Sequence, residues 1–135
     1  MDAIKTGTVF SRALTVDRAR TIDFLGESLR IYATPELVRD IEETCLAQLQ
    51  TFLGEGESSV GTEVSIAHTG ATPLGGDVRI DADITAVDGR SVTFRVSAAD
   101  SVETICTGTH KRFVVDIAKL AARVQKKTDA VRAAA

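Results

Sequence analysis

Three residues of this sequence carry functional groups that could act together in catalysis. Glu42 falls on the apolar side of an expected helix, where a buried carboxylate is costly unless another group pairs with it or uses it. His68 closes a strand-like run, and Thr34 stands at the start of the helix. A carboxylate and an imidazole can transfer protons, and the N–H groups at a helix N-terminus suit a carbonyl oxygen that gains charge. The three residues therefore suggest a catalytic site.

Spacing places Glu42 on the apolar face. The pair Thr34-Pro35 predicts a helix start, because threonine is a favoured N-cap and proline suits the first helical position. We expect the helix to continue to about Leu53, where glycines follow. At ~100° per residue Glu42 falls beside Leu53, whereas Glu43 falls on the mostly polar side. We expect Glu42 to be at least partly desolvated and Glu43 to be solvated.

Each residue also has a purely structural interpretation. Glu42 could be a boundary residue that reaches solvent, or a buried glutamate tied to a structural arginine. Thr34 could serve only as the N-cap, and His68 could bond only to the backbone at a strand end. His110 lies in another strand-like run, but two histidines without a regular cluster of further ligands argue against a metal site.

The elements around these residues predict one α+β domain spanning residues 1–135. Apolar alternation and turn signals predict strands over 7–16, 60–68, 78–86, 92–98 and 103–115, and helical spacing predicts a terminal helix from 117. Asp88-Gly89 is a strong hairpin signal, and Val9, Leu14 and Val16 are expected core contacts. Residues 17–32 fit a short helix or an ordered loop that covers a pocket. The simplest packing wraps an antiparallel sheet around the one long helix, which is the hotdog arrangement.

Composition limits the partners and the compartment. The 135 residues are 44% apolar and 26% charged, as in soluble globular proteins. A net charge of -3 argues against a nucleic-acid partner, and no run approaches the roughly 20 apolar residues of a membrane span. The N-terminus lacks the apolar core of a signal peptide, so we expect a cytoplasmic protein. Cys45 and Cys106 are expected to be buried free thiols.

Residues 60–73, which include the run His68-Thr69-Gly70-Ala71-Thr72-Pro73, resemble the fluoroacetyl-CoA thioesterase-like branch of the hotdog superfamily. The resemblance begins weakly at residues 32–34 and 42–45 and continues through residues 87–90, 96–98, 108–112 and 124–128. It is most specific in the run after His68.

The resemblance implies hydrolysis of a small acyl-CoA thioester, with Thr34, Glu42 and His68 as the catalytic set. Glu42 would be the nucleophile or the general base, His68 would protonate the thiolate or orient water, and Thr34 would position the carboxylate or attack. Gly61 and Arg112 would bind the acyl-CoA. Coenzyme A enters as part of the substrate, and no cofactor is implied. The family also implies a homodimer, or a tetramer, with the pocket at the subunit interface, so that Glu42 and His68 could come from different chains.

The sequence departs from the fluoroacetyl-specific member in two places. Residues 24–29 differ from its pocket-covering region, and the helix adds Pro35 and the charged pair Arg39-Asp40. The acyl group is therefore open. Two other functions fit the same residues: a lyase or hydratase that adds or removes ammonia or water at an acyl-CoA, and a non-catalytic acyl-CoA-binding dimer. Release of free thiol distinguishes hydrolysis from both.

Overall fold

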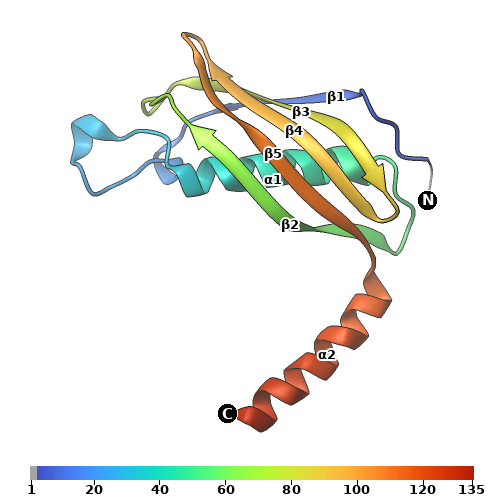
Figure 1. The fold of residues 1–135 in the computed structure, drawn as a ribbon. Helices are drawn as coiled ribbons and strands as arrows, with labels where there is room; N and C mark the ends of the chain where they lie inside the picture. Colours follow the sequence, from blue (N-terminus) through green and yellow to red (C-terminus); the bar gives the residue numbers. More distant parts are fainter. Residues whose placement is uncertain (1–2) are drawn as a thin grey trace.

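The computed structural model describes residues 3–135 and contains one antiparallel five-stranded sheet wrapped around a long helix (Figure 1). The elements in chain order are β1 (Val9–Thr15), the 3-10 turns η1 (Arg18–Arg20) and η2 (Glu27–Leu29), α1 (Thr34–Gln50), β2 (Glu57–His68), β3 (Asp77–Asp88), β4 (Ser91–Asp100), β5 (Thr104–Asp116) and α2 (Ile117–Ala134). The strand order is β1-β3-β4-β5-β2. This confirms the predicted α+β hotdog arrangement.

The core lies between α1 and the sheet. The buried stripe of α1 recurs at helical spacing and consists of Leu37, Ile41, Cys45 and Leu49. It faces the inward side chains of β3 and β4, which alternate along each strand: Ile80, Ala82, Ile84, Val92, Phe94, Val96 and Ala98. The β3–β4 hairpin turns at Gly89 with a φ of 60°, as the Asp-Gly pair predicts. Both cysteines are free and buried, as expected.

Three local predictions were wrong. Helix α1 begins at Thr34 with Ala33 as its N-cap and without a side-chain cap, because the Thr34 hydroxyl bonds elsewhere. The helix ends at Gln50 rather than near residue 53. The first strand is shorter than predicted, and Val9 is 60% exposed. Since side chains alternate along a strand, Val9 points away from the face that Leu14 uses to reach the core.

Residues 17–32 form an ordered loop with two 3-10 turns, one of the two expected forms. An anchor on α1 holds this loop: Arg20 donates two hydrogen bonds of 2.9 and 3.1 Å to Asp40, and the Tyr32 hydroxyl donates a third. Asp40 and Tyr32 are both buried, and this burial raises the pKa of Tyr32. Asp40 was expected on a charged face of the helix, and that expectation was wrong because the loop covers it.

The C-terminal helix projects from the end of β5, past the β2 edge of the sheet (Figure 1). The Asp116 carboxylate caps it by accepting a hydrogen bond of 3.0 Å from the Lys119 N–H. None of its residues is buried, so the predicted helix stands outside the core. No helix in residues 3–135 is long and apolar enough to span a membrane.

Candidate active site

Thr34 and His68 meet at one end of the sheet. Thr34 is the first residue of α1, and His68 is the last residue of β2. The Thr34 Oγ1 and His68 Nδ1 atoms lie 2.8 Å apart, within hydrogen-bond distance. Because the hydroxyl is not occupied by capping, it can serve the imidazole and a reacting group in turn. This pair was predicted as part of one site, and the structure brings the two residues together.

A cavity of about 400 Å³ lies over this pair. One wall is formed by the loop of residues 17–32, which supplies Ile22, Phe24 and Leu25. Phe24 and Leu25 are largely exposed, so they form an apolar rim rather than a core contact. The Tyr32 ring meets the His68 ring edge-on at 6.3 Å and fixes its plane. The loop therefore lines a cavity, as a wall and a rim rather than as the expected cover.

Glu42 lies at a second cavity, of about 290 Å³, with Val38 and Leu46. Its side chain is 43% exposed in the single chain, against 45% for Glu43. As predicted, Glu42 is half-buried and Glu43 is exposed as whole residues, but their side chains differ little in one chain, because the chain's own sheet does not cover this stripe of α1. The two residues differ in their partners. Glu43 accepts hydrogen bonds of 3.2 Å from Arg39 and from Arg12, whereas Glu42 faces the buried Arg112 at 3.9 Å.

Arg112 is 5% exposed and tightly held. Its Nε donates to Ser59 Oγ at 2.7 Å, and its Nη2 donates to the Ser59 carbonyl at 2.9 Å. Its Nη1 lies 3.2 Å from Nε2 of His110. Burial lowers the pKa of Arg112, whereas the charge of Glu42 raises it, and an arginine this basic stays cationic. Sequence reasoning missed His110 and Ser59. The spacing of His110 and Arg112, two residues apart on one strand, could have placed both on one face.

Gly61 completes this second cluster. A Cβ atom at this position would lie 3.1 Å from Oε2 of Glu42 and 3.2 Å from Cε1 of His110. The absence of a side chain therefore keeps the space beside the carboxylate open. A bulge between Gly61 and Glu63 bends β2 at this point. The structure thus brings together Gly61, Glu42 and Arg112.

One chain does not unite the two clusters. Thr34 and Glu42 are eight residues apart on α1, which is about 12 Å along a helix axis. The Thr34–His68 pair and the Glu42–Arg112 pair, here called the two half-sites, are thus separate, and one member of each lies on α1. Each half-site borders a cavity of its own.

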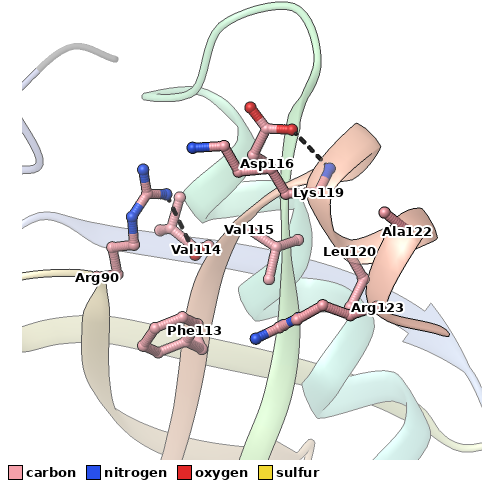
Figure 2. A pocket seen from close by; sticks show the side chains of 9 residues that line it. All are labelled: Arg90, Phe113, Val114, Val115, Asp116, Lys119, Leu120, Ala122 and Arg123. Carbon is pink, nitrogen blue, oxygen red and sulfur yellow. Dashed lines mark hydrogen bonds between the residues drawn. The ribbon is translucent and has the colours of Figure 1, made fainter. Parts of the chain in front are cut away.

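A larger cavity, about 490 Å³, lies elsewhere, where β5 passes into α2. Figure 2 shows Arg90, Lys119 and Arg123 around the apolar side chains of Phe113 and Leu120. None of the five predicted site residues lines it. Within residues 3–135, no group of three or more His, Cys, Asp or Glu side chains could hold a metal ion.

The same sheet and helix recur in solved hotdog proteins. A thioesterase superfamily member from Thermus thermophilus matches with a TM-score of 0.88 and 26% identity, over 98% of this chain and 99% of that chain. A hot-dog-like protein from Thermanaerovibrio acidaminovorans matches with a TM-score of 0.83 and 24% identity, over 90% and 91%. The fold is that of a hotdog protein of the thioesterase superfamily.

Within that superfamily, the chain belongs to the fluoroacetyl-CoA-specific thioesterase family, whose model matches residues 16–118. The fluoroacetyl-CoA thioesterase of Streptantibioticus cattleyicolor is 35% identical over 96% of this chain and 98% of that protein. A crystal structure of a fluoroacetyl-CoA-specific thioesterase variant has a TM-score of 0.86 at 33% identity, over 94% of this chain and 99% of that chain. The family predicted from the sequence is confirmed.

Proposed function

We propose that this protein hydrolyses small acyl-CoA thioesters to the free acid and coenzyme A. The hydrogen bond between Thr34 and His68 at the start of α1 carries the proposal. A thioester carbonyl placed there would meet a hydroxyl, an imidazole and the free N–H groups of a helix N-terminus. Related structures contain acetyl-CoA, or fluoroacetate with CoA, which supports a short acyl chain.

We assign Glu42 of the partner subunit to the same site. Positions 34 and 42 are symmetrical about Val38, so two antiparallel α1 helices that cross at Val38 would bring each Thr34 toward the other Glu42. Val38 lies only half-buried beside Glu42 in the single chain, which leaves this stripe available for a second helix. A homodimer of this form would also cover Glu42.

The free edge of β2 supports the same symmetry. Within residues 3–135, β2 is the last strand of the sheet, and only β5 pairs with it. An unpaired edge can extend its sheet by pairing with another copy of itself. Antiparallel pairing of two β2 edges would bring His68 near Gly61 of the partner subunit, and hence near the proposed Glu42.

The chemistry divides between the half-sites. Glu42 attacks the thioester carbonyl carbon or takes a proton from the water that attacks it. The carbon–sulfur bond then breaks, and His68 supplies the proton that the leaving thiolate takes up. Where Glu42 is the nucleophile, water then hydrolyses the acyl–Glu42 anhydride, which releases the acid and restores the carboxylate. Thr34 orients the carboxylate, and the helix N–H groups bind the oxyanion. Gly61 and Arg112 line the partner's half of the site, where the open space beside Glu42 suits the acyl group.

The test is thiol release from acetyl-, fluoroacetyl- and longer acyl-CoAs. Wild type is expected to hydrolyse a short acyl-CoA, and Thr34→Ala and His68→Ala are expected to lose most of the activity. Consumption of the acyl-CoA without release of free thiol, or tight binding without turnover, would contradict the proposal. A single turnover in ¹⁸O-labelled water distinguishes the two roles of Glu42. A nucleophilic Glu42 exchanges an oxygen of its own carboxylate with the product or the solvent, whereas a general base does not.

Mixing two inactive variants tests the shared site. Glu42→Gln and His68→Ala are each expected to be inactive as homodimers. After unfolding and refolding together, half of the dimers are mixed and each has one intact site, so about a quarter of wild-type activity should return. Absence of recovery, with mixed dimers shown by mass spectrometry, would place both residues in one subunit while leaving hydrolysis itself intact.

A further inference from the structure

We infer that His110 is a positioning residue: its neutral imidazole fixes the Arg112 guanidinium that faces Glu42. The inference rests on the proposed function, since it assigns a support to the proposed Glu42 carboxylate. His110 itself is 1% exposed and stacks on Phe94 with ring centroids 6.0 Å apart. It lies behind Arg112 and does not line the cavity of Glu42.

The hydrogen-bond partners of His110 determine its tautomer. Its Nδ1 lies 2.8 Å from the carbonyl oxygen of Glu63, which can only accept, so Nδ1 carries the hydrogen. Its Nε2 lies 3.2 Å from Nη1 of Arg112, which can only donate, so Nε2 is the acceptor. Only the neutral imidazole with hydrogen on Nδ1 satisfies both contacts. The Glu63 carbonyl lies in the segment of β2 that the bulge bends. Through this carbonyl β2 contacts His110, which in turn contacts Arg112.

The result is a guanidinium held from three sides. Ser59 accepts from Nε and Nη2, and His110 accepts from Nη1. The Nη1 atom also faces Oε2 of Glu42 at 3.9 Å, too far for a direct hydrogen bond. The Arg112 cation therefore stabilises the charged carboxylate of Glu42, while the lone pairs on the carboxylate oxygens stay available for a substrate or water. Without the His110 acceptor, the Arg112 guanidinium could tilt, and its Nη1 could donate a hydrogen bond directly to Glu42. That bond would occupy lone pairs of the carboxylate.

Matched substitutions separate positioning from packing. His110→Gln can keep an acceptor toward Arg112, His110→Asn can keep only the donor toward Glu63, and His110→Phe keeps only the ring. We expect His110→Phe and His110→Asn to lower kcat roughly 10- to 100-fold with a much smaller change in KM. We expect His110→Gln to recover most of the loss. Ile80→Ala, a core truncation on β3, is the control that lowers the melting temperature and keeps kcat.

Two readouts keep the outcomes distinct. Nitrogen NMR of the imidazole reports the tautomer without any turnover, and hydrogen on Nε2 would overturn the inference even in an active enzyme. If wild type hydrolyses thioesters and all three His110 variants match it in kcat, the positioning role is wrong. If kcat falls equally in all three and in Ile80→Ala, the role is packing alone. A wild type without hydrolysis would count against the proposed function, while the tautomer could still be measured.

Discussion

Two carboxylates of α1, Asp40 and Glu42, both face buried or half-buried arginines, yet their surroundings differ. The Asp40 side chain is 4% exposed and accepts two hydrogen bonds from Arg20 and one from Tyr32. The Glu42 side chain is 43% exposed, and no residue of the described 3–135 donates a hydrogen bond to it. Its cation, Arg112, stands 3.9 Å away.

The difference fits a structural role for Asp40 and the proposed catalytic role for Glu42. Asp40 has its lone pairs occupied, so it ties the loop of residues 17–32 to the helix and can do little else. Glu42 lies 3.9 Å from a fixed cation and has free lone pairs, which a general base or nucleophile requires. Substitutions at the two positions should therefore affect different measurements.

The largest expected effect is on turnover. Glu42→Gln keeps the shape but removes the charge, and we expect kcat for a short acyl-CoA to fall about 1,000-fold, near 4 kcal/mol in activation free energy. The melting temperature should change little. Glu43→Gln on the next, solvated position is the matched control and should keep wild-type kinetics. Equal losses in both variants would mean that the contrast between the neighbouring glutamates has no catalytic meaning.

The second effect is on stability. Asp40→Ala leaves Arg20 and Tyr32 without their buried partner, and we expect the free energy of unfolding to fall by about 3 kcal/mol. Denaturant unfolding measures it. Under conditions where the variant is folded, its kcat should stay within a few-fold of wild type. A variant with wild-type stability would show that the loop is held by other contacts.

Sequence reasoning predicted what depends on periodicity. Alternation and helical spacing gave the sheet, the hairpin at Gly89 and the buried stripe of α1, because these patterns directly report which face is covered. Sequence reasoning failed where a side chain is covered by a loop without regular secondary structure. Asp40 looks like a surface charge until the loop of residues 17–32 folds over it. Glu42 looks buried on a wheel, although the sheet of its own chain leaves it half exposed.

Contacts between residues far apart in the sequence were the second feature that sequence reasoning could not predict. Thr34 and His68 were grouped into one suggested site from their residue types, but nothing in the spacing predicted that their side chains are in direct contact. The threonine hydroxyl bonds the imidazole instead of capping the helix, a choice that depends on tertiary structure. The partners of Arg112 were missed because Ser59 is 53 residues away in sequence. The roles of the five predicted site residues stay predictions.

A smaller effect is expected at Gly61, which tests whether Glu42 needs free space. In Gly61→Ala the new Cβ would lie 3.1 Å from Oε2 of Glu42, so the carboxylate must move by a few tenths of an ångström. We expect kcat/KM to fall roughly tenfold, because small displacements of a reacting group are costly, while stability changes little. Gly89→Ala, in the distant hairpin, is the control for stability alone. An unchanged kcat/KM would show that the space is not used.

The smallest effect is on the pH dependence of stability. Burial lowers the pKa of His110, and the neighbouring Arg112 lowers it further, against opposing effects of the Glu63 carbonyl and Glu42. Below the unfolded value of about 6.5, the unfolded chain therefore binds a proton that the native ring does not. Native stability should fall as pH drops below this value, by at most about 1.4 kcal/mol per pH unit, until the native ring also takes up a proton.

His110→Gln removes this titrating group. Melting temperatures measured from pH 7.5 to 5 should therefore fall less steeply in His110→Gln than in wild type, even if the variant is less stable at every pH. Ile80→Val, which weakens the core without changing any charge, should keep the wild-type slope. Parallel curves for wild type and His110→Gln would mean that the native ring accepts a proton as readily as the unfolded chain. Such a ring would lose the Nε2 lone pair that accepts from Arg112 by protonation at about pH 6.5, so its hold on Arg112 would fail as the pH falls through that value.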